Sequence, residues 1–326
     1  MPTHLELKRH MGRADIDAVS ELLALATEVD HHHPLDEHQW LDLVQGGREG
    51  FAGVVAWEPD HSHPVGYAQL SRGPGSTRAA PSWALEFVVD PHHRQNDGGV
   101  GLQLVEAALE IVRDEGGGHV HLWVPKPTDA HDRIAEAVGL RQGRQLLQMR
   151  RGLPVTGEPA DLAVRPFMPG FDEEAWLAVN NRAFRNHNEQ GGWDLETLQR
   201  REQTDWFDPA GFLLHERDGR LAGFCWTKVH RDHEPPLGEI YVIATDPDFQ
   251  GHGLGRRLVL AGLDWLWRIG LSTAMLYVDR DNAPAVRLYE SLGFTVDHVD
   301  QAYVGDIAGV NGEAYPSPTP TTAPSA

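Results

Sequence analysis

Hydrophobic residues recur at helical spacing between positions 254 and 269 of the 326-residue chain. They are Leu254, Leu258, Ala261, Trp265 and Ile269. Side chains three or four positions apart lie on one face of an α-helix. Apolar runs at 237–245 and 273–278 have the length and composition of buried strands. The pattern therefore predicts a strand, an amphipathic helix and a second strand in succession.

Further elements are expected around this unit. Two apolar runs flank the pair Asp218–Gly219, which is a strong signal for a β-hairpin. Asp194 is suited to cap the helix that follows it, and Gly293 ends the last helix. The other expected strands are 162–165, 211–216, 221–229 and 295–303, and the other expected helices are 172–184, 195–203 and 283–292. Together they predict an α/β (α+β) fold in which a mixed, largely antiparallel sheet is flanked by helices.

The chain contains a long internal repeat. The segment from Gly98 is similar to the segment from Gly251, and an offset of 154 residues keeps later landmarks in register without a gap. This offset pairs Gly101 with Gly255, Val124 with Val278, Gly139 with Gly293 and Met149 with Tyr303, while upstream the offset becomes 156 and pairs Pro91 with Pro247. The repeat indicates a duplicated domain.

We therefore expect two tandem domains, residues 1–151 and residues 162–308, each with its own core. Residues 152–161 mix glycine, proline and acidic side chains and are expected to form a linker. The tail 309–326 is rich in proline, serine and threonine, a composition that favours disorder.

Acidic residues outnumber basic ones. The chain has 48 Asp and Glu against 28 Lys and Arg, a formal net charge of −20. Nucleic acid and anionic membranes reward clustered positive charge, so we expect neither as a partner. No apolar run is long enough to span a bilayer. The single cysteine, Cys225, fits a reducing compartment and stands in an apolar run, where a buried hydrophobe is expected rather than a nucleophile. We expect a monomeric, cytoplasmic protein.

The 19 histidines raise the question of a metal site. None of them stands in a HExxH or Cys/His ligand spacing. His119 and His121 alternate within an expected strand and therefore share a face, but two such residues do not make a metal site. We expect no bound metal.

A glycine-rich loop connects the strand at 237–245 to the helix from Leu254. Residues Gln250–Gly255 read Q-G-H-G-L-G. Glycines allow a tight turn there and let backbone N–H groups point at an anion, and the helix N-terminus adds a partial positive charge. The spacing fits neither GxxxxGK[ST] nor GxGxxG. A pyrophosphate is the expected occupant; the alternative is a helix start that needs glycine for packing.

With its surroundings, this loop resembles a known family. Q-x-x-G-x-G between a strand and a helix, followed by Asn282, Ala285, Tyr289, Gly293 and Phe294, is similar to the GNAT-type acetyltransferases. The resemblance implies that the loop binds the pyrophosphate of acetyl-coenzyme A and that the later segment flanks its pantetheine arm. The implied coenzyme positions are Ile243, Ala244, Thr245, Gln250, Gly251, His252, Gly253, Leu254, Gly255, Arg256, Asn282, Ala283, Pro284, Ala285, Val286 and Arg287.

The reaction that the resemblance implies is attack of a neutral amine on a thioester. Glu239 is the expected general base, and two-residue alternation places it on the same face as Tyr241 and Ile243. Backbone N–H groups of residues 243–245 are expected to donate to the carbonyl oxygen. The resemblance makes Tyr289 the acid that protonates the departing thiolate. The alternatives are a solvated carboxylate for Glu239 and a core aromatic for Tyr289.

The first copy departs from the second at these chemical positions. By the offsets above, Ala135 stands in place of Tyr289, Thr128 in place of Asn282, and Trp83 in place of Glu239. Asp97 in its longer loop repels a pyrophosphate. We expect the first domain to be catalytically inactive. It either holds coenzyme A weakly, through Phe87, Val88, Val89 and residues 98–101, or serves as scaffold and cleft wall.

Two fused domains with only the second intact, together with the segments Asn188–Trp193 and Trp226–His230, are similar to the mycothiol synthase family. This resemblance covers nearly the whole ordered chain. It implies a small-molecule acceptor, the cysteinyl amine of a cysteinyl-glucosaminyl-inositol. The implied acceptor positions are Glu37, Glu189, Lys228, Glu239 and Tyr277, with Asp36 as the alternative to Glu37. Two other functions stay open, acetylation of a different amine and non-catalytic sensing of acetyl-coenzyme A.

Overall fold

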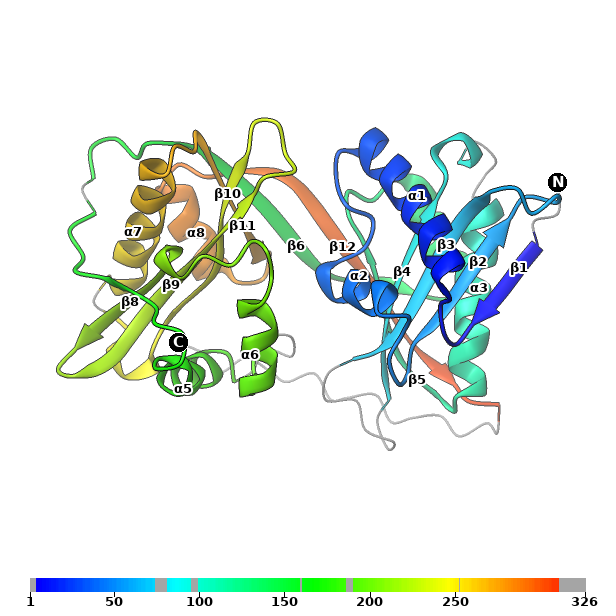
Figure 1. Ribbon diagram of the computed structural model, residues 1–326, viewed down its shortest axis with the longest axis horizontal. Helices are drawn as coiled ribbons and strands as arrows, with labels where there is room; N and C mark the ends of the chain where they lie inside the picture. Colours follow the sequence, from blue (N-terminus) through cyan, green and yellow to red (C-terminus); the bar gives the residue numbers. More distant parts are fainter. Residues whose placement is uncertain are drawn as a thin grey trace. The chain divides into compact units, whose positions relative to one another are not determined.

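The structure is a computed structural model that describes residues 4–73, 81–94, 99–158, 160–185, 190–251 and 253–310, with only the backbone of Glu37. The chain forms two compact units. The first unit consists of the residues up to Gln145 together with those from Asp300 onward, and the second unit is Leu146–Val299. Figure 1 traces the elements of both units.

The first unit is a mixed sheet with helices on both faces. Its strands are β1 (His4–Lys8), β2 (Ala52–Trp57), β3 (Pro64–Arg72), β4 (Ser82–Val89), β5 (Gly117–Val124) and the end of β12 (Thr295–Ala308), and its helices are α1 (Arg13–Asp30), α2 (Glu37–Val44), α3 (Gly99–Asp114) and α4 (Asp129–Ala137). The strand order is β1-β2-β3-β4-β5-β12. The strands β4 and β5 are parallel, whereas β1 with β2, β2 with β3, β3 with β4 and β5 with β12 are antiparallel. α3 and α4 pack on one face of the sheet, and α1 and α2 on the other.

The second unit repeats this plan. Its strands are the end of β6 (Arg141–Gly152), β7 (Arg165–Pro166), β8 (Phe212–Arg217), β9 (Arg220–His230), β10 (Leu237–Thr245) and β11 (Thr273–Asp279), and its helices are α5 (Glu173–Ala183), α6 (Leu195–Glu202), α7 (Leu254–Arg268) and α8 (Ala283–Ser291). Short 3-10 turns occur in this unit at η2 (Pro209–Gly211) and η3 (Pro247–Phe249), and in the first unit at η1 (Pro91–His93). The strand order is β6-β11-β10-β9-β8-β7, with β10 and β11 parallel. The predicted fold class and the repeat are therefore confirmed.

The two faces of the second sheet differ in chemistry. α7 and α8 cover one face with an aliphatic core, which we call the α7 face. α5 and α6 cover the other face with a core built around Trp176, Trp226, Phe212 and Phe224, which we call the aromatic face. Because side chains alternate along a strand, each residue of β10 or β11 belongs to one face or the other. This assignment decides which predicted site residues can act together.

One predicted strand is largely absent. Residues 162–165 were expected to be extended, but β7 has only Arg165 and Pro166. Leu162 is instead buried in the aliphatic core of the α7 face. Its apolar character comes from that packing and not from a position in the sheet ladder.

The closing strands are exchanged between the two copies. β6 begins in the first unit, but its residues from Leu146 pair with β11 of the second. β12 begins in the second unit, and its residues from Gln301 pair with β5 of the first. The predicted domain limits 1–151 and 162–308 are therefore wrong at the closing strands. Local sequence predicts a strand but not its partner, because the partner is fixed by long-range pairing.

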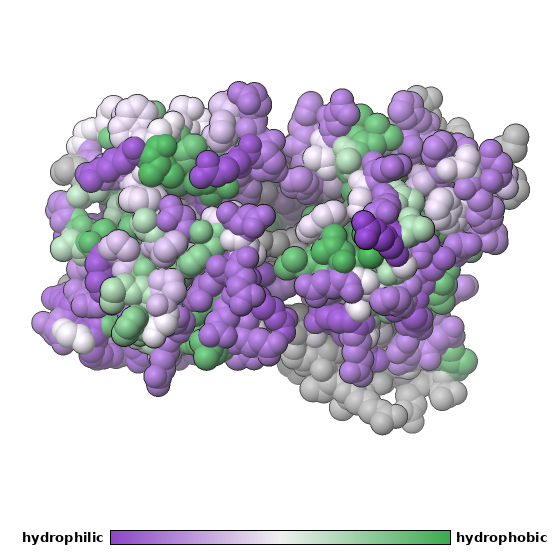
Figure 2. All heavy atoms as spheres, viewed as in Figure 1, coloured by the Kyte–Doolittle hydropathy of each residue, from purple (hydrophilic) through white to green (hydrophobic). Residues whose placement is uncertain are grey.

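The face drawn in Figure 2 is mostly hydrophilic, with hydrophobic side chains in separate groups on each unit. In the part of the chain that the structure describes, no helix combines the length and the apolar character needed to cross a membrane.

Candidate active site

The candidate site begins where β10 and β11 part. These parallel strands are paired at only two positions, Gly238 with Ala274 and Glu239 with Met275. On its other edge, β10 stays paired with β9 as far as Thr245. Within the described residues, the edge of β10 that faces β11 therefore has no strand pairing from residue 240 to residue 245. The backbone groups of Ile243, Ala244 and Thr245 lie on this stretch, as a role in binding an extended ligand arm requires.

A β-bulge lies at the same place. The register between β10 and β9 shifts between Ile240 and Val242, so Tyr241 is the extra residue. A bulge interrupts the alternation of side chains. Tyr241 packs on the aromatic face, whereas Ile243 packs on the α7 face. The prediction that Glu239, Tyr241 and Ile243 share a face is therefore wrong for Ile243.

Glu239 lies on the aromatic face. Its parallel neighbour is Met275. The preceding residue, Ala274, belongs to the α7 face, so alternation places Met275 and Glu239 on the opposite face. Its antiparallel partner Lys228 places Nζ 4.4 Å from the ring centroid of Trp206 and 5.3 Å from that of Tyr241. Only 6% of Glu239 is exposed, so the alternative of a solvated strand carboxylate is wrong. Buried carboxylates need partners, and those of Glu239 bear on its chemistry.

The partner of the Glu239 carboxylate is His230, at the end of β9. Its Nε2 lies 2.7 Å from Glu239 Oε2. The segment Trp226–His230 carries part of the family resemblance, but no role was predicted for His230 itself. The available signal was its position two residues after Lys228, on the same face of the strand. That signal was insufficient because the six residues between β9 and β10 leave the register of the pair undetermined from the sequence.

Tyr277 lies on the same face as Glu239. Its neighbours Leu276 and Val278 belong to the α7 face, so alternation turns Tyr277 to the aromatic face, where it is 39% exposed. Its hydroxyl accepts a hydrogen bond from Gln148 Nε2 at 2.7 Å. Three predicted acceptor positions, Lys228, Glu239 and Tyr277, are thus brought to one face.

For two further predicted acceptor positions, Glu37 and Glu189, the side chains lie outside the described part of the structure. The backbone of Glu37 begins α2, whereas all of Glu189 is outside the described residues. The alternative Asp36 is the cap of α2, because its Oδ1 accepts from the Gln39 backbone N–H at 2.7 Å.

The aromatic face carries further polar contacts that the sequence did not reveal. Arg201 on α6 is only 5% exposed. Its Nε donates to the Tyr241 hydroxyl at 3.1 Å, and its guanidinium lies 5.6 Å from the Trp193 ring centroid. Together with Lys228, this arginine gives the aromatic face two cations that contact Tyr241.

The glycine loop has the conformation that an anion site needs. Gly251 has φ +86° and Gly253 has φ +70°, in the left-handed region that glycine adopts readily. A Cβ at either position meets nothing within 4 Å, and at Gly255 only Thr245 Oγ1 at 3.9 Å. The alternative of glycine for close packing is therefore wrong at these three positions. α7 follows at once, so its free N–H groups and dipole lie at the loop. His252 lies outside the described residues.

Arg256, in the first turn of α7, is already engaged. Its guanidinium makes two hydrogen bonds to the Glu158 carboxylate, and its Nη1 donates to Ser291 Oγ at 2.7 Å. The Glu158 contact raises the pKa of Arg256. Of the predicted coenzyme-binding residues that carry a positive charge, Arg256 is the nearer to the loop in the sequence. Because exposed ion pairs are weak, a pyrophosphate can replace Glu158 as its partner.

The start of α8 and Tyr289 lie on the α7 face. Asn282 Oδ1 accepts from the Ala285 N–H at 3.3 Å and caps the helix, which also contains Ala283, Pro284, Val286 and Arg287. Tyr289 is 7% exposed and contacts the ring of Phe294 at 5.9 Å between centroids. Burial raises the pKa of its phenol to about 12. Tyr289 is thus a core residue, and one that keeps its proton at neutral pH.

The site therefore uses both faces of the parted strands. The glycine loop, α8 and Tyr289 belong to the α7 face, and Glu239, Lys228 and Tyr277 belong to the aromatic face. The carboxylate of Glu239 and the phenol of Tyr289 thus lie on opposite faces of this sheet. This arrangement suits transfer of an acyl group between two ligands that approach from opposite faces.

Clusters of histidine are present, but we assign them no metal. Among the described residues, His230, Asp232 and His233 offer ligand atoms within 4.8 Å of one another. His230 Nε2, however, is bonded to Glu239. His119 and His121 share a face as predicted, with ring centroids 4.6 Å apart. Burial and the neighbouring His119 lower the pKa of His121 to about 4.

The first unit lacks the corresponding groups. The pairing of β4 with β5, Ala84 with His121, matches that of Glu239 with Met275. Ala84 is therefore the counterpart of Glu239, and the predicted counterpart Trp83 is wrong by one residue. The bulge at Tyr241 causes the difference, because no register shift is found between β3 and β4. Ala135, in the place of Tyr289, is buried in the core.

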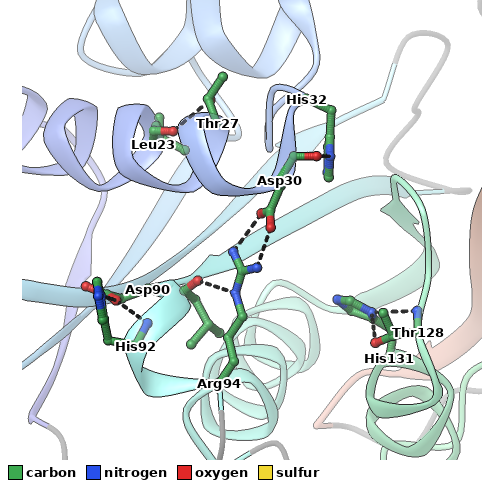
Figure 3. A network of polar contacts seen from close by, with 10 residues as sticks. Leu23, Thr27, Asp30, His32, Asp90, His92, Arg94, Thr128 and His131 are labelled. Carbon is green, nitrogen blue, oxygen red and sulfur yellow. Dashed lines mark hydrogen bonds and ion pairs between the residues drawn. The ribbon is translucent and has the colours of Figure 1, made fainter.

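The end of β4 is occupied by a polar network (Figure 3). Arg94 makes two hydrogen bonds to the Asp30 carboxylate, at 2.6 and 2.7 Å, and its Nε donates to the Val89 carbonyl at 2.9 Å. The ring of His131 lies 5.7 Å from that of Phe87 and accepts from the Thr128 N–H. The predicted weak coenzyme positions Phe87, Val88 and Val89 thus lie next to groups that already have partners. The loop residues 95–98 are outside the described residues.

Comparison with known proteins assigns the fold to a class. The model of the acetyltransferase (GNAT) family matches residues 16–139 and again 175–294. Two solved structures share the fold over nearly the whole chain. A GCN5-related N-acetyltransferase from Sphaerobacter thermophilus has a TM-score of 0.68 at 24% identity and covers 95% of this chain and 98% of its own. A tandem GNAT protein from the clavulanic acid biosynthesis pathway has a TM-score of 0.67 at 17% identity and covers 94% and 99%. The protein is a tandem GNAT acetyltransferase.

Relatives with higher sequence identity define a family within this class. A mycothiol acetyltransferase from Acidimicrobium ferrooxidans is 45% identical over 288 residues, which cover 86% of this chain and 91% of the relative. Another from Thermobispora bispora is 44% identical over 310 residues, covering 93% and 99%, and one from Streptomyces coelicolor is 41% identical over 307 residues. The chain belongs to the mycothiol acetyltransferase family.

Proposed function

We propose that the protein transfers the acetyl group of acetyl-coenzyme A to the cysteinyl amine of cysteinyl-glucosaminyl-inositol, the last step in mycothiol biosynthesis. The observation that carries this proposal is the buried carboxylate of Glu239 at the point where β10 and β11 part, beside a glycine loop of left-handed conformation. The relatives named mycothiol acetyltransferase support a role in mycothiol biosynthesis, and the acceptor is the one that the sequence resemblance implies.

Acetyl-coenzyme A, when bound, supplies a thioester whose carbonyl carbon is open to attack. The loop Gln250–Gly255, with Arg256, holds its pyrophosphate through backbone N–H groups, the helix dipole and one guanidinium. Leu254 contributes only its backbone, because its side chain is in the core. Asn282 and the first turn of α8 flank the extended arm of the coenzyme.

The acceptor amine loses its proton to Glu239 as its nitrogen bonds to the carbonyl carbon. Backbone N–H groups of residues 243–245 stabilise the charge that develops on the carbonyl oxygen. The carbon–sulfur bond then breaks, and Tyr289 donates its phenol proton to the departing thiolate. A phenol with a pKa of about 12 is fully protonated at neutral pH, as an acid must be.

The acceptor binds along the aromatic face. Lys228 and Tyr277 lie beside Glu239 and offer a donor and a hydroxyl to a polyhydroxylated ligand. Glu37 and Glu189 remain proposed contacts. The acidic chain, with its net charge of −20, favours a positively charged acceptor over an anionic one.

The test is a comparison of acceptors. The protein is incubated with acetyl-coenzyme A and either cysteinyl-glucosaminyl-inositol, glucosamine or a cysteine-terminated peptide, and products are measured by mass spectrometry. We expect kcat/KM to be highest for the first acceptor by at least about 100-fold, because acceptors without the sugar and inositol leave polar groups of the site unpaired. Equal turnover of the three amines contradicts the assignment of this acceptor. Binding of the coenzyme without turnover of any amine contradicts the assignment of an enzymatic activity.

We infer that the first unit is not catalytic. Ala84 and Ala135 stand where a base and an acid are needed, and Arg94 is held by Asp30. Calorimetric titration of the full chain with coenzyme A is expected to give one tight site per chain. Two sites of equal affinity contradict this inference. A monomeric, cytoplasmic protein without a bound metal remains our prediction.

A further inference from the structure

The hydrogen bond between His230 and Glu239 is the most specific contact of the candidate base. Nε2 of His230 lies 2.7 Å from Oε2 of Glu239, and the two side chains are 19% and 8% exposed. An ionised carboxylate accepts hydrogen bonds and cannot donate them. The imidazole must therefore donate its Nε2–H to Oε2, which leaves Oε1 as the oxygen available to an amine.

The surroundings of this pair restrict what else can hold the carboxylate. On β9, Lys228 is the cross-strand neighbour of Glu239, but its ammonium lies over the rings of Trp206 and Tyr241. On β11, the neighbour Met275 has no hydrogen-bonding proton. The turn after His230 contributes the exposed Asp232 and the ring of His233, whose centroid lies 6.0 Å from that of His230. Within the described residues, the hydrogen bond from His230 is the contact that holds the Glu239 carboxylate directly.

A general base acts only in the right geometry. A side chain with several free rotations loses rate if its carboxylate turns away from the proton that it abstracts. Glu239 lies next to a bulge, where the ladder on one side is irregular and the parallel strand on the other departs. The backbone alone therefore does not fix its side chain, and a second group is needed to orient it.

We propose that His230 is a positioning residue for the acetyl-transfer reaction: its Nε2–H binds Oε2 of Glu239 and turns Oε1 toward the acceptor amine. This proposal rests on the proposed function, in which Glu239 is the general base. The histidine forms and breaks no bond to substrate. The amine proton goes to Oε1, and the hydrogen bond to Oε2 persists throughout.

Two substitutions separate positioning from simple packing. In His230→Gln, the amide Nε2–H can take the place of the imidazole Nε2–H, whereas His230→Phe keeps a ring and has no donor. We expect kcat to fall about 10- to 100-fold in His230→Phe and to stay within about 5-fold of wild type in His230→Gln. KM for acetyl-coenzyme A is expected to be unchanged in both, because His230 lies on the aromatic face, away from the glycine loop. His233→Phe, in the same turn, is the matched control and is expected to leave kcat unchanged.

The outcomes distinguish this proposal from the proposed function. If wild type turns over an amine and His230→Phe is as fast as wild type, the positioning role is wrong. If His230→Gln is as slow as His230→Phe, or His233→Phe is equally slow, the hydrogen bond is not the cause. If wild type acetylates no amine, the proposed function fails, and the proposal is then tested by the tautomer of His230. Nitrogen-15 NMR of the ring is expected to show a proton on Nε2 in the full-length protein, and a neutral ring protonated only at Nδ1 contradicts the proposal.

Discussion

At the scale of single residues, the site is built from a few side chains whose surroundings fix their protonation and direction. Glu239 is buried against His230, and Tyr289 is buried in the core of the opposite face. Both residues were predicted from the sequence. The burial of Glu239 was not predicted, and a core position of Tyr289 was the alternative to its role as the acid. Burial is important for their chemistry, because a buried group depends on particular partners for its charge and orientation.

Replacing the base is expected to remove most of the turnover. In Glu239→Gln, the amide cannot accept the proton of the amine, so kcat should fall about 100-fold or more. The affinity for coenzyme A, measured by calorimetry, should stay within about 2-fold, since the glycine loop is untouched. Glu196→Gln is the control, because Glu196 is 73% exposed in its side chain and pairs with Arg200. A variant Glu239→Gln that keeps wild-type kcat rules out general-base catalysis by this residue.

Removing the phenol hydroxyl of Tyr289 tests the acid. In Tyr289→Phe the ring still packs against Phe294, so the unfolding midpoint should change little, while kcat should fall about 10-fold or more. Burial raises the Tyr289 pKa to about 12, so the native protein holds this proton more tightly than the unfolded chain, whose tyrosine titrates near about 10. The stabilisation of the folded state by this proton is fully present below about pH 10, where the tyrosine of the unfolded chain is also protonated. It is lost as the pH rises toward 12.

Denaturant unfolding at pH 8 and pH 11 measures this loss. The wild type is expected to lose more stability between the two values than Tyr289→Phe loses. Equal losses, or equal kcat values for the two proteins at neutral pH, argue against the assigned protonation and role of Tyr289.

At the scale of elements, the bulge in β10 and the parting of β10 from β11 create the site. The extra residue Tyr241 turns Ile243 to the α7 face and leaves Glu239 on the aromatic face. The parallel ladder stops after two pairs, which makes a strand edge accessible from both faces. The loop that follows then presents the N-terminus of α7 to the same edge.

Two glycines with matched backbone angles separate strain from coenzyme binding. Gly253 in the loop has φ +70°, Gly219 in the hairpin turn has φ +72°, and a Cβ at either meets nothing within 4 Å. An alanine at either position costs about 1–2 kcal/mol of backbone strain. Both variants should therefore unfold at similarly lower denaturant concentrations, but only Gly253→Ala should weaken coenzyme A binding, by about 10-fold or more. Equal coenzyme affinity in the two variants contradicts the loop as the pyrophosphate site.

At the scale of the whole molecule, the exchange of the closing strands ties the two copies together. β5 of the first unit pairs over residues 117–124 with the end of β12, which is the last strand of the chain. β11 of the second unit pairs with the end of β6. Each sheet therefore takes its closing strand from the other repeat, and the copies are not separable at the segment between them.

Cutting the chain at that segment is expected to leave both fragments unstable. A fragment that ends at residue 151 lacks β12 and leaves the edge of β5 unpaired, and an exposed strand edge favours aggregation. Co-expression with the fragment from residue 152 is expected to restore a soluble complex. Size-exclusion chromatography and circular dichroism measure both results. A fragment 1–151 that is soluble, folded and monomeric alone contradicts the role of β12.

The repeat, the fold class and the residue types of the chemistry were predictable from the amino-acid sequence alone. Periodicity predicted the helix at 254–268 almost to the residue, and the glycine loop and Tyr289 were recognisable because such motifs are local. Tertiary structure decided which face Ile243 takes, that Ala84 is the counterpart of Glu239, that His230 holds Glu239, and which sheet each closing strand joins. These features depend on a bulge and on pairing between distant segments. Local patterns do not specify either, because strand register and partner are fixed by the packing of the whole fold.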